Sequence, residues 1–418
     1  MILEFGGGHA EGTVSPPPSK SHTHRAFFIA GMAEGLSRIS GPLMSADTKA
    51  TLSAVRFMGA DVSVHEGDLL IQGGDMHPGL GTVDVLNSGT TMRIFAGIAS
   101  LFNVPVTITG DESIRKRPMG PLLDALDSMG VSCVSRNGFP PVTITGPNRG
   151  GDVRIDGSVS SQFVSSIMLA APMMEKGACI HVGGSLVSAP YVRITESIIR
   201  KFGGNVGITG NLIEIGNRRY KANDYSVPAD FSSAAFPLVA GALGGGVTAT
   251  GLDLTDAQGD RAIMDILRRA GAKVVSSGSS VTSEKENLEA IDVNMGDTPD
   301  LFPIVAVLLS TAKGTSRLHG APHLRFKESD RIESTVRMIN SLGGDATGTE
   351  DGCIIRGVGR LKGGNIDHLD DHRIMMAAAV ASLVCDGPVS MKDTGCHAVS
   401  YPGFVEQMAT LGIKVVRK

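Results

Sequence analysis

The chain has 418 residues, of which 42% are hydrophobic and 19% are charged, so it can bury more than one core and should divide into at least two domains. Its formal net charge of -4 at pH 7 excludes the strong positive field with which a protein binds nucleic acid or an anionic membrane surface. The five cysteines form no C-x-x-C pair, so we expect neither a disulfide framework nor a zinc site, and their wide spacing suits a reducing cytosol.

The N-terminal residues do not resemble a targeting signal. Residues 1–5 are followed by three glycines, and they lack both a basic region and a long apolar run. Farther along, apolar stretches such as residues 304–309 are far too short to span a bilayer. We therefore expect a cytoplasmic protein without a membrane segment.

One structural unit recurs along the chain: an amphipathic helix that ends in an apolar residue and a glycine, then a strand, a turn and a second strand. In the first copy, the apolar residues within 52–58 predict the helix, and Gly59 can adopt the left-handed conformation that ends it. Residues 62–64 and 69–71 then predict the two strands. The first copy thus defines the pattern that the later copies repeat.

The later copies keep this order and spacing. The second copy has a helix over residues 122–129, a strand around Cys133 and another strand over residues 142–146. A later copy has a helical stripe over residues 263–267 and a strand over residues 273–275. Six glycines mark the helix ends and recur about every 70 residues: Gly59, Gly130, Gly203, Gly271, Gly343 and Gly412.

The last copy stops one strand short. It ends at Val415 and Val416, so the missing closing strand would have to come from residues 2–5 at the N-terminus. We therefore expect one domain of three repeats over residues 12–228, and a second domain of three repeats over residues 1–11 and 229–418. A plain tandem of α+β units without a functional cleft is the alternative, but polar clusters at one place in each repeat argue against it.

Polar motifs precede six of the predicted helices. The N-terminus of a helix presents unpaired backbone N–H groups and the positive end of the helix dipole, so each of these turns can bind an anion. Lysine and arginine add charge-assisted bonds, which are bidentate for arginine. Together the motifs predict a site for a small polyanion. They occupy residues 19–25, 87–93, 115–118, 158–162, 327–331 and 370–373.

Single motifs also have plainer interpretations. Ser88 and the residues after it could be an ordinary N-cap before a helix that we expect to begin near Met92. Gly89 could admit a ligand to the backbone, or it could only be needed for a positive φ. The motif at residues 327–331 could be a solvated charged face, and the acidic pair before His372 could suggest metal ligands, although no other residues complete a familiar set.

Two carboxylates stand out among the cationic motifs. Asp300 and Glu328 would lie in a site otherwise rich in lysine and arginine. Cationic neighbours keep carboxylates ionised and able to accept protons. His22 and His24 are two residues apart, which places them on different sides of a helix and argues against a metal pair.

Taken together, the motifs resemble those of the enolpyruvyl transferase family over essentially the whole chain. The resemblance is carried by residues 18–25 (PSKSHTHR), 87–93 (NSGTTMR), 116–119 (KRPM), 157–163 (GSVSSQF), 324–331 (LRFKESDR) and 371–373 (DHR). It implies an α/β (α+β) fold, a two-domain inside-out α/β barrel. Each domain would contain three βαβαββ repeats with helices packed inside, and the active site would lie in the cleft between the domains.

The resemblance also implies two small-molecule substrates, phosphoenolpyruvate and shikimate 3-phosphate, and no metal or organic cofactor. By similarity, phosphoenolpyruvate would be bound by Lys20, Gly89, Arg117, Gln162, Arg331 and Arg373. Shikimate 3-phosphate would be bound by Lys20, Ser21, Arg25, Ser160, Ser161, Gln162, Ser188, Tyr191, Asp300 and Lys327. We expect a monomer that binds neither nucleic acid nor membrane.

The implied chemistry is an addition followed by an elimination. The 5-hydroxyl of shikimate 3-phosphate would attack C2 of phosphoenolpyruvate while C3 is protonated, and the tetrahedral intermediate would then expel phosphate. Asp300 would face the reacting hydroxyl, and Glu328 and Lys20 would transfer protons to and from the methylene carbon.

One position departs from the family pattern. Many members carry a lysine before the final helix where this chain has Val399. His397 could partly replace that lysine, or it could be a structural histidine.

Two other functions remain to be distinguished. The sister enzyme that acts on UDP-N-acetylglucosamine typically has Lys-Asn where this chain has Lys20 and Ser21, and it has a reactive cysteine in a loop that matches residues 111–120, where this chain has none. A binding protein that keeps the fold without activity is the second alternative. Retention of Lys20, Asp300 and Glu328 argues against it.

Overall fold

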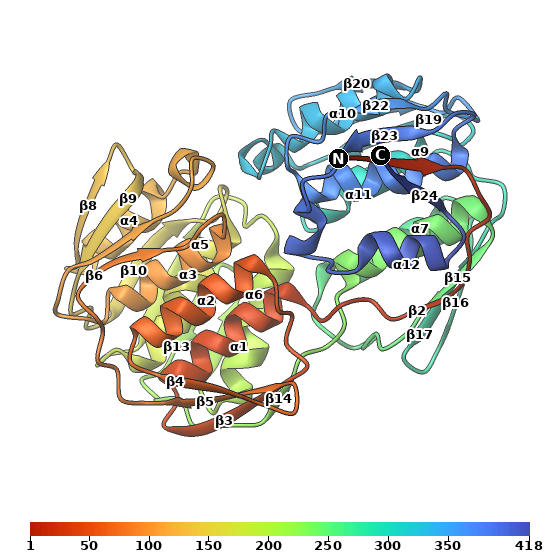
Figure 1. Ribbon diagram of the computed structural model, residues 1–418. Coiled ribbons are helices and arrows are strands. Elements are labelled where there is room, and N and C mark those ends of the chain that lie inside the picture. Colours follow the sequence, from red (N-terminus) through yellow and green to blue (C-terminus); the bar gives the residue numbers. More distant parts are fainter. The chain divides into compact units, whose positions relative to one another are not determined.

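The computed structural model describes residues 1–418 and divides the chain into two compact units. We call Pro18–Val227 the middle unit, and Met1–Pro17 with Pro228–Lys418 the terminal unit (Figure 1). The chain enters the middle unit at Pro18 rather than at the expected residue 12, because β2 (Glu11–Val14) pairs with β15 (Gly246–Ala249) of the terminal unit.

The middle unit contains three four-stranded sheets. In order across the first sheet, the strands are β14 (Tyr225–Ser226), β3 (Gly35–Ser40), β5 (Asp68–Gly73) and β4 (Asp61–His65). Those of the second sheet are β6 (Gly81–Asp84), β7 (Val106–Thr109), β9 (Phe139–Thr145) and β8 (Ser132–Arg136). Those of the third sheet are β10 (Gly151–Asp156), β11 (Ala178–Gly183), β13 (Leu212–Ile215) and β12 (Val206–Thr209). Its helices are α1 (Lys20–Met32), α2 (Ala46–Phe57), α3 (Gly89–Ala99), α4 (Gly120–Ser128), α5 (Ser161–Ala170) and α6 (Ala189–Lys201).

The terminal unit repeats this architecture. Its first sheet contains β16 (Lys273–Ser277), β17 (Ser280–Glu284), β15 and β2, in this order. Its second sheet contains β18 (Asp292–Asn294), β19 (Thr315–His319), β21 (Cys353–Arg356) and β20 (Asp345–Gly348). Its third sheet contains β22 (Gly364–Ile366), β23 (Val389–Lys392), β1 (Ile2–Gly6) and β24 (Lys414–Arg417). Its helices are α7 (Phe231–Gly244), α8 (Ile263–Arg269), α9 (Phe302–Leu309), α10 (Arg331–Ser341), α11 (His372–Ala381) and α12 (Phe404–Thr410). Short 3-10 turns in the middle unit cover Ile114–Lys116 and Ala171–Met173. Those in the terminal unit cover Gly259–Ala262, Pro299–Leu301, Pro322–Phe326, Ser382–Val384 and Cys396–Val399.

The six sheets share one topology. In each sheet one neighbouring pair of strands is parallel and the other two pairs are antiparallel, as in a βαβαββ unit. The predicted strands at residues 62–64, 69–71, 142–146 and 273–275 are all present, as β4, β5, β9 and β16. The repeat predicted from the sequence is therefore confirmed.

The glycines that end the repeating helices adopt the predicted backbone. Gly59 has a φ of 101° and Gly412 has a φ of 104°, and the four equivalent glycines also have positive φ. A side chain disfavours this conformation, whereas glycine adopts it freely. The glycine thus lets the chain leave the helix and start the next strand.

The N-terminal strand closes the last sheet, as predicted. β1 lies between β23 and β24 and is antiparallel to both, with Phe5 opposite Val389 on one side and Val415 on the other. The two chain ends therefore meet in one sheet (Figure 1).

Two kinds of helix build each unit. In α9 all eight residues are apolar and buried, and α7 and α11 are also buried along their whole length. In the middle unit α1, α3 and α5 are buried on nearly all sides. The remaining helices bury a single face, as α10 does. Helices therefore fill the interior of each unit. No helix has both the length and the apolarity needed to cross a membrane.

Candidate active site

The polar motifs stand at helix N-termini, as predicted. Ser19, Ser88, Ser160, Asp330 and Asp371 cap α1, α3, α5, α10 and α11, and each side chain accepts a hydrogen bond from a backbone N–H of the first turn. The α3 helix begins at Gly89 rather than near Met92, because the Ser88 side chain accepts from the N–H of Thr91. The sixth motif precedes α4 without a side-chain cap.

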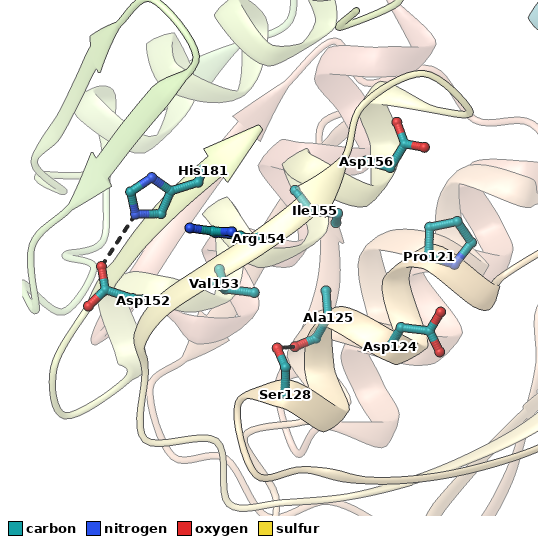
Figure 2. Close-up of a pocket in the computed structure, with 10 residues that line it drawn as sticks. All are labelled: Pro121, Asp124, Ala125, Ser128, Asp152, Val153, Arg154, Ile155, Asp156 and His181. Atoms are coloured by element: carbon teal, nitrogen blue, oxygen red, sulfur yellow. Dashed lines mark hydrogen bonds and ion pairs between the residues drawn. The ribbon is translucent and has the colours of Figure 1, made fainter. Parts of the chain in front are cut away.

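A surface pocket in the middle unit contains none of the predicted substrate residues (Figure 2). It is lined by α4, by β10 and by His181 of β11. The chemistry predicted from the helix N-termini therefore has to be sought elsewhere, at the starts of the buried helices.

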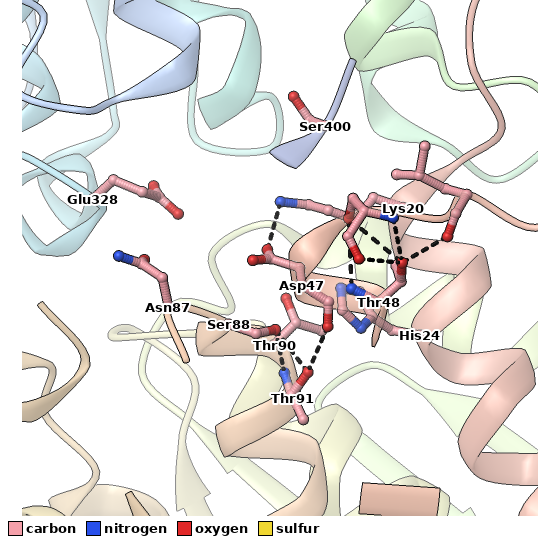
Figure 3. Close-up of polar contacts among 12 residues, drawn as sticks. Lys20, His24, Asp47, Thr48, Asn87, Ser88, Thr90, Thr91, Glu328 and Ser400 are labelled. Atoms are coloured by element: carbon pink, nitrogen blue, oxygen red, sulfur yellow. Dashed lines mark hydrogen bonds and ion pairs between the residues drawn. The ribbon is translucent and has the colours of Figure 1, made fainter. Parts of the chain in front are cut away.

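Lys20, the first residue of α1, is held by a carboxylate that sequence reasoning missed. Its Nζ donates to Oδ2 of Asp47 at 3.1 Å, and both side chains are largely buried (Figure 3). Asp47 lies in the first turn of α2, where Ser45 and Thr48 form a capping box that fixes the helix start. The sequence signal that could have identified Asp47 is its position two residues after Ser45, the N-cap of α2.

Arg117 lies against the start of α3. Its Nη2 donates to Oδ1 of Asn87 at 2.9 Å and to Oγ of Ser113 at 3.3 Å. A Cβ added at Gly89 would come 2.6 Å from Nη1 of Arg117. Gly89 does not have a positive φ, so the interpretation that it is needed only for backbone strain is wrong. Its lack of a side chain instead leaves room for the guanidinium.

Gln162 is fixed by two neighbours. Its Oε1 accepts from Nη1 of Arg93 at 2.8 Å, and its Nε2 donates to Oγ1 of Thr90 at 2.9 Å. The Arg93 guanidinium also lies over the ring of Phe163, 5.5 Å from its centre. Arg93 and Thr90 belong to the motif at residues 87–93, although sequence reasoning gave them no role. The starts of α3 and α5 are thereby joined.

Arg25 is 1% exposed and bonds mainly within the protein. Its Nε donates to Oγ1 of Thr195 at 2.8 Å, its Nη1 to the carbonyl of Ser21 at 3.0 Å, and its Nη2 to Ser165 and to the carbonyl of Tyr191, both at 3.3 Å. Burial lowers the pKa of Arg25 to about 10, so the side chain stays charged at neutral pH. These bonds join α1 to α5 and α6, and they bring Ser21 and Tyr191 to one place.

The four predicted serine ligands all lie at helix starts, and Ser21 is the second residue of α1. Ser160 caps α5, and Ser161 is its first residue and is buried. Ser188 precedes α6 with a φ of 55°, a conformation that is uncommon for a residue with a side chain. Strained residues of this kind cluster at ligand sites, which fits the predicted role.

In the terminal unit, Arg331 is enclosed by three carboxylates. The side chain is 1% exposed and contacts Asp300 at 2.9 Å, Glu328 at 2.6 Å and Asp371 at 3.0 Å. Burial alone would lower the pKa of Arg331, but the three carboxylates raise it, so the guanidinium is firmly charged. The predicted residues Asp300, Glu328 and Arg331 are thus brought together, and Asp371 is an additional partner.

Arg373 completes this cluster from the start of α11. Its Nη2 donates to Oδ2 of Asp300 at 2.8 Å. Burial favours the neutral form of Asp300, yet the charges of Arg373, Arg331 and Lys327 hold its pKa below the ordinary range. The predicted Lys327 therefore acts electrostatically on Asp300, which stays ionised.

Two further buried groups border the cluster. Burial and the Asp300 charge raise the pKa of Asp260 to about 7, although Ser232 donates a hydrogen bond to it. Burial and Lys327 lower the pKa of His323 to about 3, so this histidine is neutral. Neither lies in a motif, and no sequence signal identified them.

The segment that departs from the family pattern forms the 3-10 turn Cys396–Val399. The His397 ring lies 6.3 Å from the Phe404 ring, and burial lowers its pKa, so it is mostly neutral near pH 7. These features support the structural interpretation of His397.

The chain is similar to known proteins over nearly its whole length. The family model described as EPSP synthase (3-phosphoshikimate 1-carboxyvinyltransferase) matches residues 6–408. A relative from Methanocorpusculum labreanum named 3-phosphoshikimate 1-carboxyvinyltransferase is 50% identical over 417 residues, 99% of each chain. A relative of the same name from Methanocella arvoryzae is 40% identical over 422 residues, which is 99% of this chain and all of the other.

A solved structure has the same fold. EPSP synthase from Acinetobacter baumannii superposes with a TM-score of 0.84 at 29% identity, and the match covers all of both chains. The family match extends over nearly the whole sequence and the relatives are similar in length. The chain therefore belongs to the EPSP synthase (3-phosphoshikimate 1-carboxyvinyltransferase) family.

Proposed function

We infer that this protein transfers the enolpyruvyl group of phosphoenolpyruvate to the 5-hydroxyl of shikimate 3-phosphate and releases phosphate. The observation that carries this function is the family match over residues 6–408. The chain keeps Lys20 as the first residue of α1, and it keeps Asp300 and Glu328 bonded to Arg331. The reaction belongs to the synthesis of chorismate and the aromatic amino acids.

The proposed phosphoenolpyruvate ligands are cations with fixed geometry. Arg117 lies beside Gly89, the buried first residue of α3, whose missing side chain leaves space for the guanidinium. Arg331 and Arg373 share Asp300 as a partner, so an incoming phosphate or carboxylate would compete with that aspartate. Lys20 and Gln162 complete the proposed set. Guanidinium groups suit this task because they bind oxyanions through two parallel N–H bonds.

The proposed shikimate 3-phosphate ligands are mainly hydroxyls and backbone groups at helix starts. Ser160, Ser161 and Ser188 stand at the N-termini of α5 and α6, where N–H groups favour a phosphate. Lys327 would add a charge to the same ligand. The buried Arg25, with Ser21 and Tyr191 bonded to it, would face the carboxylate and ring of the substrate.

The addition step requires a base for the 5-hydroxyl proton and an acid for the methylene carbon. Asp300 is the proposed base. Its depressed pKa makes it a weak base while Arg331 and Arg373 are bonded to it. Binding of the anionic phosphoenolpyruvate to these two arginines would offset their charge and raise the Asp300 pKa, so the base would become effective when both substrates are present.

The elimination step reverses the proton transfers. A proton leaves the methyl carbon formed in the addition, the C–O bond to phosphate breaks and the enol ether double bond forms. Glu328 and Lys20 are the proposed groups for this carbon, and each is held by a partner of opposite charge, Arg331 at 2.6 Å and Asp47 at 3.1 Å. Positioned acids and bases of this kind contribute typically about 100- to 10,000-fold in rate.

We also propose that the protein is a cytoplasmic monomer. Its five cysteines are all free, which suits a reducing compartment. Light scattering of the purified protein tests the oligomeric state.

Product analysis tests the proposed function. Incubation with both substrates should give a compound whose mass exceeds that of shikimate 3-phosphate by one enolpyruvyl group, together with an equal amount of phosphate. A product formed from UDP-N-acetylglucosamine instead would assign the sister activity, and no product from either acceptor would indicate a binding protein.

A further inference from the structure

The outer face of the third sheet of the middle unit carries a cluster of potential metal ligands. Asp152 lies in β10, Cys179 and His181 lie in β11, and Glu214 lies in β13. Strand pairing puts Asp152 opposite Cys179 on one side and Glu214 opposite Cys179 on the other. Because side chains alternate along a strand, Cys179 and His181 point to the same face, away from the buried Ile180 between them.

The three donor atoms already lie at nearly the spacing of a zinc site. The His181 Nε2 is 3.5 Å from Oδ1 of Asp152 and 3.8 Å from Sγ of Cys179, and all three ligand atoms lie within 4.8 Å of one another. A tetrahedral ion with Zn–S of about 2.3 Å and Zn–N and Zn–O of about 2.1 Å spaces sulfur and nitrogen about 3.6 Å apart, and nitrogen and oxygen about 3.4 Å apart. Small side-chain movements would complete this geometry.

We propose that Asp152, Cys179 and His181 bind a zinc ion on this face, with Glu214 or water as the fourth ligand. A thiolate together with an imidazole favours zinc over magnesium or calcium, which prefer oxygen ligands alone. On binding, the Cys179 thiol loses its proton to solvent and the sulfur bonds to the metal. Burial and the nearby carboxylates Asp152 and Glu214 raise the pKa of this thiol, and a bound cation would reverse the effect of the two carboxylates.

Solvent can reach the cluster from two sides. The pocket in Figure 2 includes Asp152 and His181, and the labelled side chain of Arg154 lies near them. A second pocket is lined by Asp152, Cys179, Glu214 and Lys176. Before an ion binds, the carboxylates of Asp152 and Glu214 offset the charges of Arg154 and Lys176, and the thiolate that forms on binding adds a third negative charge beside the cation.

A second cluster shows why donor spacing alone is insufficient. In the terminal unit, Cys396 Sγ lies 3.8 Å from Nδ1 of His368, and Asp370 lies beside them. However, Nδ1 of His368 accepts from the backbone N–H of Asp370 at 3.1 Å, and Nε2 contacts the carbonyl of Lys392 at 2.8 Å. Both ring nitrogens of His368 are therefore already bonded to backbone groups. The contacts of His181 instead run through Nε2 to the other proposed ligands.

A bound ion would fasten β10 to β11, and it would lie among residues that have no proposed role with the substrates. We therefore expect zinc to raise the melting temperature of the full-length protein while turnover stays unchanged. Ligands that bind only the folded state stabilise it in proportion to the logarithm of their concentration over Kd.

The test uses full-length protein stripped with a chelator and titrated with zinc by calorimetry, and with cobalt by absorbance. Wild type should bind one equivalent and show an ultraviolet thiolate-to-cobalt band. Cys179→Ser should lose the band, His181→Asn should weaken zinc binding at least tenfold, and both should retain normal turnover. Cys133→Ser, on β8 of the neighbouring sheet, is the matched control and should bind like wild type. Absence of binding in wild type, or binding that Cys179→Ser leaves intact, would overturn the proposal.

Discussion

Replacing Gly89 with alanine tests whether the Arg117 guanidinium binds phosphoenolpyruvate. The new Cβ would lie 2.6 Å from Nη1 of Arg117, whereas non-bonded atoms pack at about 3.5 Å or more, so the guanidinium must move by roughly 1 Å. The moving group is the end of a flexible side chain, and alanine favours helix over glycine by up to about 1 kcal/mol. We therefore expect the melting temperature to stay the same or rise slightly.

Substrate binding should respond more strongly than stability. Loss of one charge-assisted hydrogen bond costs about 1.5–3 kcal/mol, which corresponds to a roughly 10- to 150-fold rise in the Michaelis constant for phosphoenolpyruvate. The constant for shikimate 3-phosphate should change little.

Steady-state kinetics with each substrate varied in turn, together with thermal unfolding, measures both effects. Gly120→Ala is the matched control, since Gly120 also begins a helix and a Cβ there meets nothing within 4 Å. A lowered melting temperature with an equal change in both Michaelis constants would refute the assignment of Arg117.

Three further changes test the terminal unit. Asp300→Asn and Glu328→Gln should bind both substrates by calorimetry yet lose about a hundredfold or more in turnover, and near-normal rates would contradict their proton-transfer roles. Asp371→Ala removes a charge-assisted hydrogen bond to the buried Arg331 and the N-cap of α11, and it should cost about 2–5 kcal/mol in urea unfolding, although Asp300 and Glu328 still offset the Arg331 charge. Asp386→Ala, at the exposed pair with Arg360, should cost about 1 kcal/mol or less. Asp260 has a pKa raised to about 7, so the folded state keeps a proton that the unfolded state releases near pH 4. Stability should thus fall as pH rises from about 4 to 7, and Asp260→Asn should flatten that dependence; an unchanged slope would rule out Asp260 as its source.

The sequence predicted the fold well because its signals are local and repeated. Each helix of the repeat ends in a glycine with positive φ, and each strand pair follows within a few residues, so one unit could be recognised and then counted. The closing role of β1 followed from the same count, since the last copy lacked one strand. The motifs at helix starts were also local, because an N-cap and the turn after it occupy consecutive residues.

The polar contacts within the site could not be predicted in the same way. Asp371 and Arg331 are 40 residues apart in sequence, and only folding brings them to 3.0 Å. The ion pair of Lys20 with Asp47 likewise joins two different helices. The cysteine spacing predicted no zinc site, whereas the proposed cluster takes its ligands from neighbouring strands, where pairing rather than sequence separation decides which side chains meet.

The most direct test of the assigned function is phosphate release measured with each substrate alone and with both together. This function predicts continuous release of phosphate only when phosphoenolpyruvate and shikimate 3-phosphate are both present, and a rate lower by about a hundredfold or more in the Asp300→Asn variant. Release from phosphoenolpyruvate alone at the same rate, or no release with the two substrates together, would contradict it.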